Sequence, residues 1–91
     1  MGLSEFLGAA LGVVAGTALV AKWMEIKDSG ELHFAISNDI SNFNPGTAQI
    51  MHGTLKSTAH TYSVSSDRTM RDQANLVLRV FAEESRRRNL L

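Results

Sequence analysis

An uncharged stretch near the start of the chain constrains its fold more than any other feature. None of the 16 side chains from Phe6 to Ala21 carries a charge, and within this run glycine recurs every fourth residue. On a helix such residues share one face, and a face of small residues lets a second helix approach closely. The sequence therefore predicts an apolar helix over residues 1–24 with a helix-association face. That face consists of Ser4, Gly8, Gly12 and Gly16.

A single membrane span is the first interpretation of residues 1–24. Lys22 and Trp23 follow the uncharged run, and a lysine beside an aromatic residue is typical of a membrane–water interface. Counted from Leu3 to Ala21, the stretch approaches the ~20 residues that a spanning helix uses. Lysines and arginines follow it, and cationic flanks stay in the cytoplasm. We therefore expect a single-pass membrane protein whose C-terminal tail is cytoplasmic.

Other interpretations of the same stretch stay open. It can be a core helix, buried at the subunit interface of a soluble, cytoplasmic oligomer. It can be a signal peptide, although Glu5 stands where basic residues are expected. In a third alternative only residues 4–14 are helical, within a soluble α+β domain in which the rest of the stretch is a strand. An N-myristoylation signal is excluded, because Phe6 occupies a position that requires serine or threonine.

The chain begins Met-Gly-Leu and continues into a span rich in glycine and alanine. In this respect residues 1–24 resemble the glycine-zipper small membrane proteins of bacteria (YtxH-like). The resemblance implies a membrane-associated N-terminal helix. It covers no residue after position 24, and it implies no activity, cofactor or partner for the chain.

Residues 25–91 are predicted to form a polar helical tail. Asp28 followed by Glu31 resembles a capping box, which would start a helix whose apolar residues recur at helical spacing. The same region is also compatible with a short hairpin over residues 23–36, because Asp28-Ser29-Gly30 is a turn signal. The helix is favoured, since its apolar pattern extends further along the chain.

A further helix is expected from about Pro45 to Tyr62. Proline is common at the first position of a helix, and asparagine is common at the N-cap before it. Asn44 and Pro45 have this order. Gly53 and several threonines weaken the helical tendency of the segment.

The last helix is predicted over residues 67–89, with Ser65 or Ser66 as its N-cap. Its apolar residues form a stripe that is broader than one neighbouring helix needs, and we expect it to dock a partner protein or a second copy. This partner-docking face consists of Met70, Ala74, Val77, Leu78 and Phe81. The helix ends in three arginines, which suit a solvated helix C-terminus or contact with anionic lipid. They are Arg86, Arg87 and Arg88.

The composition excludes several classes of site. Nine basic and nine acidic residues give zero net charge, so charge offers no argument for nucleic-acid binding. The lack of cysteine excludes disulfides, thiol nucleophiles and cysteine-based metal sites. His33, His52 and His60 lack the spacing of metal ligands on one helix. No catalytic motif, cofactor or small-molecule substrate is therefore predicted.

Together these features predict a non-enzymatic, membrane-anchored assembly or accessory subunit that acts through helix–helix association. A soluble helical oligomer, with the N-terminal helix buried at the subunit interface, is the first alternative. A holin-like protein that forms membrane lesions is the second. All three require protein partners or further copies of the chain, and all three depend on residues 1–24.

Overall fold

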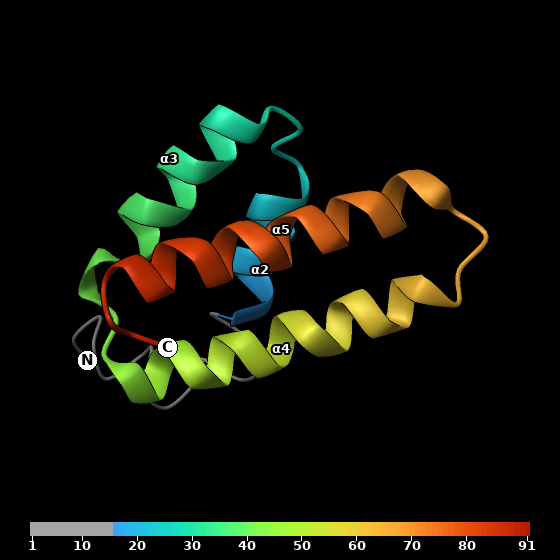
Figure 1. Cartoon of the computed structure of the whole chain (residues 1–91). Coiled ribbons are helices and arrows are strands. Elements are labelled where there is room, and N and C mark those ends of the chain that lie inside the picture. Colours follow the sequence, from blue (N-terminus) through green and yellow to red (C-terminus); the bar gives the residue numbers. More distant parts are fainter. Residues whose placement is uncertain (1–15) are drawn as a thin grey trace.

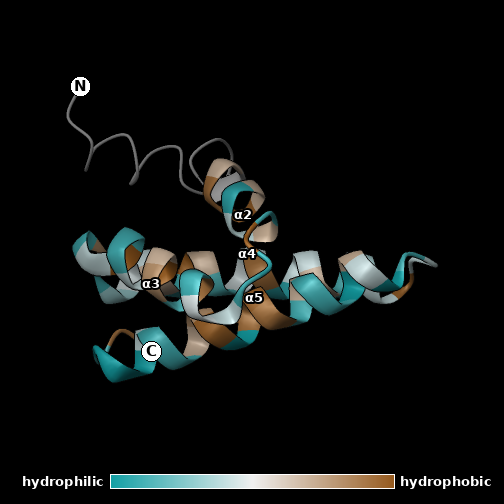
Figure 2. Ribbon diagram, turned by 90° about the horizontal axis from the view of Figure 1, so that it is seen from above, coloured by the Kyte–Doolittle hydropathy of each residue, from teal (hydrophilic) through white to brown (hydrophobic). Residues whose placement is uncertain are grey.

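The computed structural model describes residues 16–91, which form helices and contain no strand. The elements are α2 (Gly16–Met24), α3 (Ser29–Asp39), the short 3₁₀ helix η2 (Ile40–Asn42), α4 (Pro45–Ser63) and α5 (Arg68–Arg87). Helices α4 and α5 form an antiparallel hairpin, and α3 packs on the other side of α5 (Figure 1). Helix α2 lies across one face of this layer and contacts the other three helices (Figure 2). The mainly α fold is thus confirmed for the described residues.

Helices α3 and α4 begin at the caps that their sequences encode. The side chain of Asp28 accepts a hydrogen bond from the backbone N–H of Glu31 at 2.8 Å. Asn44 accepts one from the backbone N–H of Thr47 at 2.8 Å, with Pro45 as the first helical residue. The helix after Asp28 is therefore confirmed, and the hairpin over residues 23–36 is wrong.

Helix α5 begins at a different cap from the one expected. Asp67 Oδ1 accepts the backbone N–H of Met70 at 3.2 Å, so Asp67 is the N-cap. The hydroxyl of Ser65 instead accepts the backbone N–H of Asp67 at 3.1 Å within the loop. The expectation of Ser65 or Ser66 as cap is wrong, because the carboxylate of Asp67 suits the positive end of the helix at least as well.

Helix α5 also ends two residues before the expected position. Asn89 has a φ of 58°, in the left-handed region. The backbone N–H of Leu90 then bonds to the carbonyl of Ser85 at 2.8 Å, and that of Asn89 bonds to the carbonyl of Arg86 at 3.0 Å. This pair of bonds is a Schellman motif, which closes a helix by satisfying its last carbonyls.

Helix α2 contains the end of the uncharged stretch. Because Gly16–Met24 is helical, the alternative with a strand after Val14 is wrong. The remainder of the predicted N-terminal helix, residues 1–15, lies outside the described residues. Within the described part of the chain, no helix combines the length and apolar character needed to cross a membrane.

One hydrophobic core joins the four α-helices. Trp23 of α2, Ile36 of α3, Met51 of α4 and Phe81 of α5 are all fully buried in it. Helix α2 therefore shares its core with the tail that follows. Helix α5 is the central element, since each of the other three packs most extensively against it.

Candidate interaction site

Trp23, which follows the uncharged stretch in α2, fixes the end of that stretch to the rest of the protein. Its side chain is 0% exposed, and the centroid of its ring lies 5.9 Å from that of Phe81. Trp23 Nε1 donates a hydrogen bond to Asp39 Oδ2 at 2.8 Å, and Lys22 Nζ forms a salt bridge with the same oxygen at 2.8 Å. The lysine–tryptophan pair expected at a membrane interface is thus engaged by α3 and α5.

Gln73 of α5 provides a second attachment. Its buried side-chain amide donates to the carbonyl of Trp23 at 3.2 Å and to that of Ile26 at 2.7 Å. Carbonyls at a helix C-terminus have no partner within the helix. Gln73 therefore satisfies carbonyls at and just after the end of α2, and it sets where α2 lies on α5.

A groove with a volume of about 490 Å³ opens beside α2. Its walls come from three helices and are mainly apolar. We call it the α2/α4 groove, and it is lined by Val20, Ala21, Met24, Thr58, Tyr62 and Met70. One acid and one base, Glu25 and Lys27, also line it. Its volume lies within the ~300–1,000 Å³ of typical binding pockets.

The predicted partner-docking face of α5 lies against other helices of the same chain. Ala74, Val77 and Phe81 are buried in the core. Leu78 and Met70 are partly buried and pack against it. Met70 is the member of the set that also lines the α2/α4 groove. The breadth of the stripe is explained by the position of α5 among three helices.

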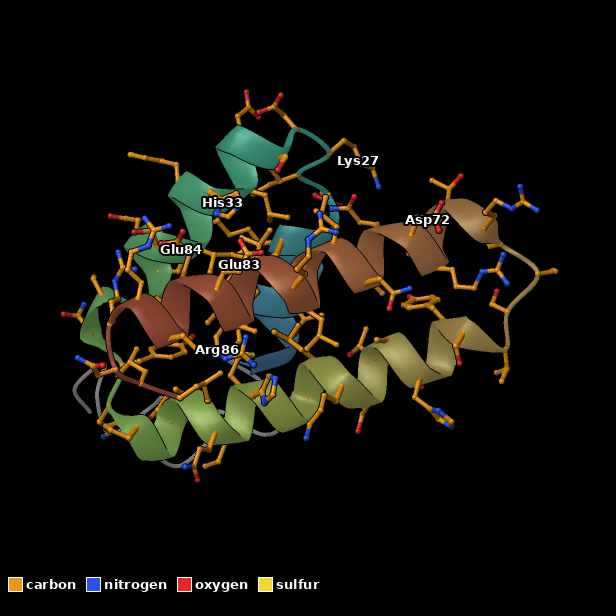
Figure 3. All side chains as sticks on the ribbon, viewed as in Figure 1. Lys27, His33, Asp72, Glu83, Glu84 and Arg86 are labelled. Atoms are coloured by element: carbon orange, nitrogen blue, oxygen red, sulfur yellow. The ribbon has the colours of Figure 1, made fainter. Side chains whose placement is uncertain are left out.

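The three arginines at the end of α5 have different surroundings. Arg88 donates to Glu84 Oε1 at 2.9 Å and also to the hydroxyl of Ser37. Arg87 is 3.6 Å from Glu84 Oε2, and its side chain is 71% exposed. Arg86 lies on the side of α5 that faces α4 (Figure 3). Arg88 is therefore engaged within the fold, whereas Arg86 and Arg87 are exposed.

Glu84 is the centre of a charged cluster between α3 and α5 (Figure 3). Its side chain is only 5% exposed. His33 Nδ1 lies 3.0 Å from Glu84 Oε2, and His33 Nε2 lies 3.7 Å from Glu83 Oε2. The hydrogen bond with His33, helped by Arg88 and Arg87, lowers the pKa of Glu84 below its ordinary value, against the opposing effect of burial. The carboxylate therefore stays ionised and accepts the Nδ1–H of His33.

The other two histidines lie in separate places. The ring of His52 stacks on that of Phe81, with centroids 6.2 Å apart. Burial, together with the charges of Lys56 and Arg86, lowers the pKa of His52. His60 is exposed on α4. Within residues 16–91, no three potential metal ligands come together.

Sequence reasoning missed the polar residues that fix the helices to one another. Gln73 and Glu84 continue the apolar stripe of α5, because they stand four residues before Val77 and four after Val80. Their places in that periodicity could have identified them as buried. Asp39 gave no comparable signal, since its partners Lys22 and Trp23 lie on another helix.

The candidate site thus has two parts, the anchored end of the uncharged stretch and the α2/α4 groove beside it. Val20 and Met24 belong to both, because they are buried in the core and line the groove. Of the helix-association face, Gly16 lies in α2, whereas Ser4, Gly8 and Gly12 precede the described residues.

Comparison of the chain with protein families, curated proteins and solved structures gives no match.

Proposed function

We propose that this protein is a non-enzymatic assembly subunit that associates through its apolar N-terminal stretch. One observation carries the proposal: helix α2, which contains the end of this stretch, is fixed in the core through Trp23. A stretch attached in this way leaves the domain from a defined point, not from a loose linker. An element held at one end binds a partner with a smaller loss of conformational entropy.

The partner of the stretch is another helix of the assembly. The helix-association face, Ser4/Gly8/Gly12/Gly16, offers small residues to an approaching helix. The uncharged residues that precede α2 run from Phe6 to Ala15. Ten helical residues are about 15 Å long, half of the ~30 Å core of a bilayer. The burial of Val20, Trp23 and Met24 in the domain therefore favours a protein partner.

A membrane-anchored form of the same subunit is the second candidate. The run from Phe6 to Ala21 has no charge, and Arg87 at the end of α5 is 71% exposed. An exposed arginine near a bilayer surface attracts anionic headgroups. In this form the domain lies on the cytoplasmic side, as the lysines and arginines after the stretch require.

The oligomeric state of the full chain tests the proposal. Wild type is expected to associate, as measured by light scattering and cross-linking. Gly12→Leu is expected to weaken association, because the added side chain separates the helices. Ala10→Leu is the matched control, since position 10 lies on the opposite side of a helix from positions 8 and 12. A wild type that stays monomeric, or a Gly12→Leu variant with unchanged association, would overturn the proposal.

Fractionation of expressing cells separates the two candidates. Recovery of wild type in the supernatant as a defined oligomer without detergent is the result expected for a protein partner. Recovery in the membrane fraction, with release only by detergent, is the result expected for the anchored form. In that case proteolysis of inside-out vesicles should remove the domain.

A further inference from the structure

The α2/α4 groove is an apolar surface at the point where three helices meet. Val20 and Met24 of α2 lie in it and are 7% exposed, so their buried side chains form its floor. Tyr62 of α4 and Met70 of α5 are half-buried and provide its sides. A mainly apolar hollow of this kind can accept complementary apolar side chains.

The charges of the groove indicate what kind of occupant it accepts. Glu25 and Lys27 are one acid and one base, so they leave the groove without net charge. Lys27 Nζ also donates to the carbonyl of Met24 at 3.1 Å, which occupies part of its hydrogen-bonding capacity. A charged ligand would find no opposite net charge here. An uncharged apolar segment matches the groove better.

This chain itself contains such a segment. From Phe6 to Ala15 every residue is uncharged, and the run includes Phe6, Leu7, Leu11, Val13 and Val14. These side chains gain most by leaving water. The segment is also covalently joined to α2, so each copy that carries a groove carries one potential occupant.

The direction of α2 favours the segment of a second copy. The chain enters α2 at Gly16, whereas Ala21 and Met24 lie one to two turns further along the helix. To reach the groove of its own copy, the segment would have to reverse direction immediately before Gly16. The segment of a second copy can lie in the groove without any reversal, and a two-fold arrangement then fills both grooves at once.

We propose that the α2/α4 groove binds the apolar segment Phe6–Ala15 of a second copy of this chain. The inference rests on the proposed function, because it names the surface on which the N-terminal stretch associates. It makes the dimer reciprocal, since each copy gives one segment and receives one.

Two variants of the full chain test the two halves of this contact. Thr58→Arg places a long cationic side chain in the groove and leaves the segment unchanged. Leu11→Glu places a charge in the segment and leaves the groove unchanged. Ser57→Arg is the matched control for the first variant, because Ser57 is exposed on α4 next to Thr58 and does not line the groove. Circular dichroism checks that each variant keeps the helical content of wild type.

Sedimentation of each variant alone and of their mixture gives the result. We expect wild type and Ser57→Arg to dimerise, and Thr58→Arg and Leu11→Glu each to be monomeric. Mixed together, the two monomeric variants should form a 1:1 heterodimer, because one intact segment and one intact groove remain. That restored contact is expected to be weaker than the wild-type dimer, which has two.

The other outcomes overturn the inference in distinguishable ways. If Thr58→Arg dimerises as wild type does, association occurs elsewhere, so the groove is wrong while the proposed function stands. If both variants are monomeric and the mixture also stays monomeric, the segment and the groove do not meet between copies. If wild type is monomeric at all concentrations, the proposed function and this inference fail together.

Discussion

Helices α3 and α4 both pack against α5, but they are held there by different kinds of contact. Helix α3 buries Leu32 and Ile36. Within residues 16–91, its side chains also form salt bridges and hydrogen bonds with other parts of the chain, and each of these contacts includes a charged side chain. Helix α4 buries four side chains, and within the same residues no salt bridge joins it to α5. The attachment of α3 should therefore respond to pH, whereas that of α4 should respond to changes of side-chain volume.

The largest expected effect on stability comes from the apolar contacts of the core. Phe81 is fully buried, and its ring lies against Trp23 of α2 and His52 of α4. Phe81→Ala removes these contacts and leaves a cavity, so the free energy of unfolding should fall by about 3–5 kcal/mol. Urea denaturation measures the change.

Phe34→Ala is the matched control for that prediction. Phe34 is 77% exposed on α3, and its removal should change the free energy of unfolding by less than about 0.5 kcal/mol. Similar losses for the two substitutions would show that the core does not centre on Phe81.

The next effect concerns the charged attachment of α3. Glu84→Gln removes the charge that His33 and Arg88 share, while the side chain keeps its size. Hydrogen bonds to a charged group are worth about 1.5–3 kcal/mol, and a loss of stability in this range is expected. Urea denaturation at neutral pH measures it.

The neighbouring Glu83→Gln provides the control for this charge. Glu83 is 49% exposed and 3.7 Å from His33, so its contribution is screened by water. Equal effects of the two substitutions would contradict the view that the buried carboxylate holds α3 on α5.

The fold was predictable where its causes are local. Asp28 and Asn44 stand at the spacing that caps require, and α3 and α4 begin where these residues predict. The contacts that attach α3 were not predictable in this way. Trp23 and Asp39 are 16 residues apart, and His33 and Glu84 are 51 apart, so each pair exists only because the helices cross.

The candidate site was predictable only in part, for a related reason. The uncharged stretch and its glycine spacing are visible in the sequence. The α2/α4 groove is not, because its lining combines α2 with residues such as Thr58 and Met70 from two later helices. No periodicity within one helix indicates which side chains of another helix will stand opposite.

A smaller effect is expected when the charge of Glu84 is titrated. Its pKa is lowered in the folded protein from the ordinary 4.5. Above that value Glu84 is ionised in both states, so its contribution to stability is complete. As the pH falls through the lowered pKa, the folded state must also take up a proton, and the contribution is lost.

The difference in stability between wild type and Glu84→Gln measures this titration. It should shrink progressively as the pH falls below about 5. His33, Glu83, Arg87 and Arg88 face Glu84 in both proteins. A difference that grew as the pH fell below about 5 would mean that the folded protein raises the pKa of Glu84.

The smallest expected change in stability concerns a glycine of α4. Gly53 lies in the middle of α4, and a β-carbon built there meets no atom within 4 Å. Alanine loses less backbone entropy than glycine when a helix forms, so Gly53→Ala should stabilise the protein by about 0.5–1 kcal/mol. Gly30→Ala is the contrast, because its β-carbon would lie 3.3 Å from the Asp28 oxygen that caps α3. A gain at Gly53 without an equal gain at Gly30 is expected from thermal unfolding, since the added methyl group has free space at Gly53 but crowds the Asp28 carboxylate at Gly30.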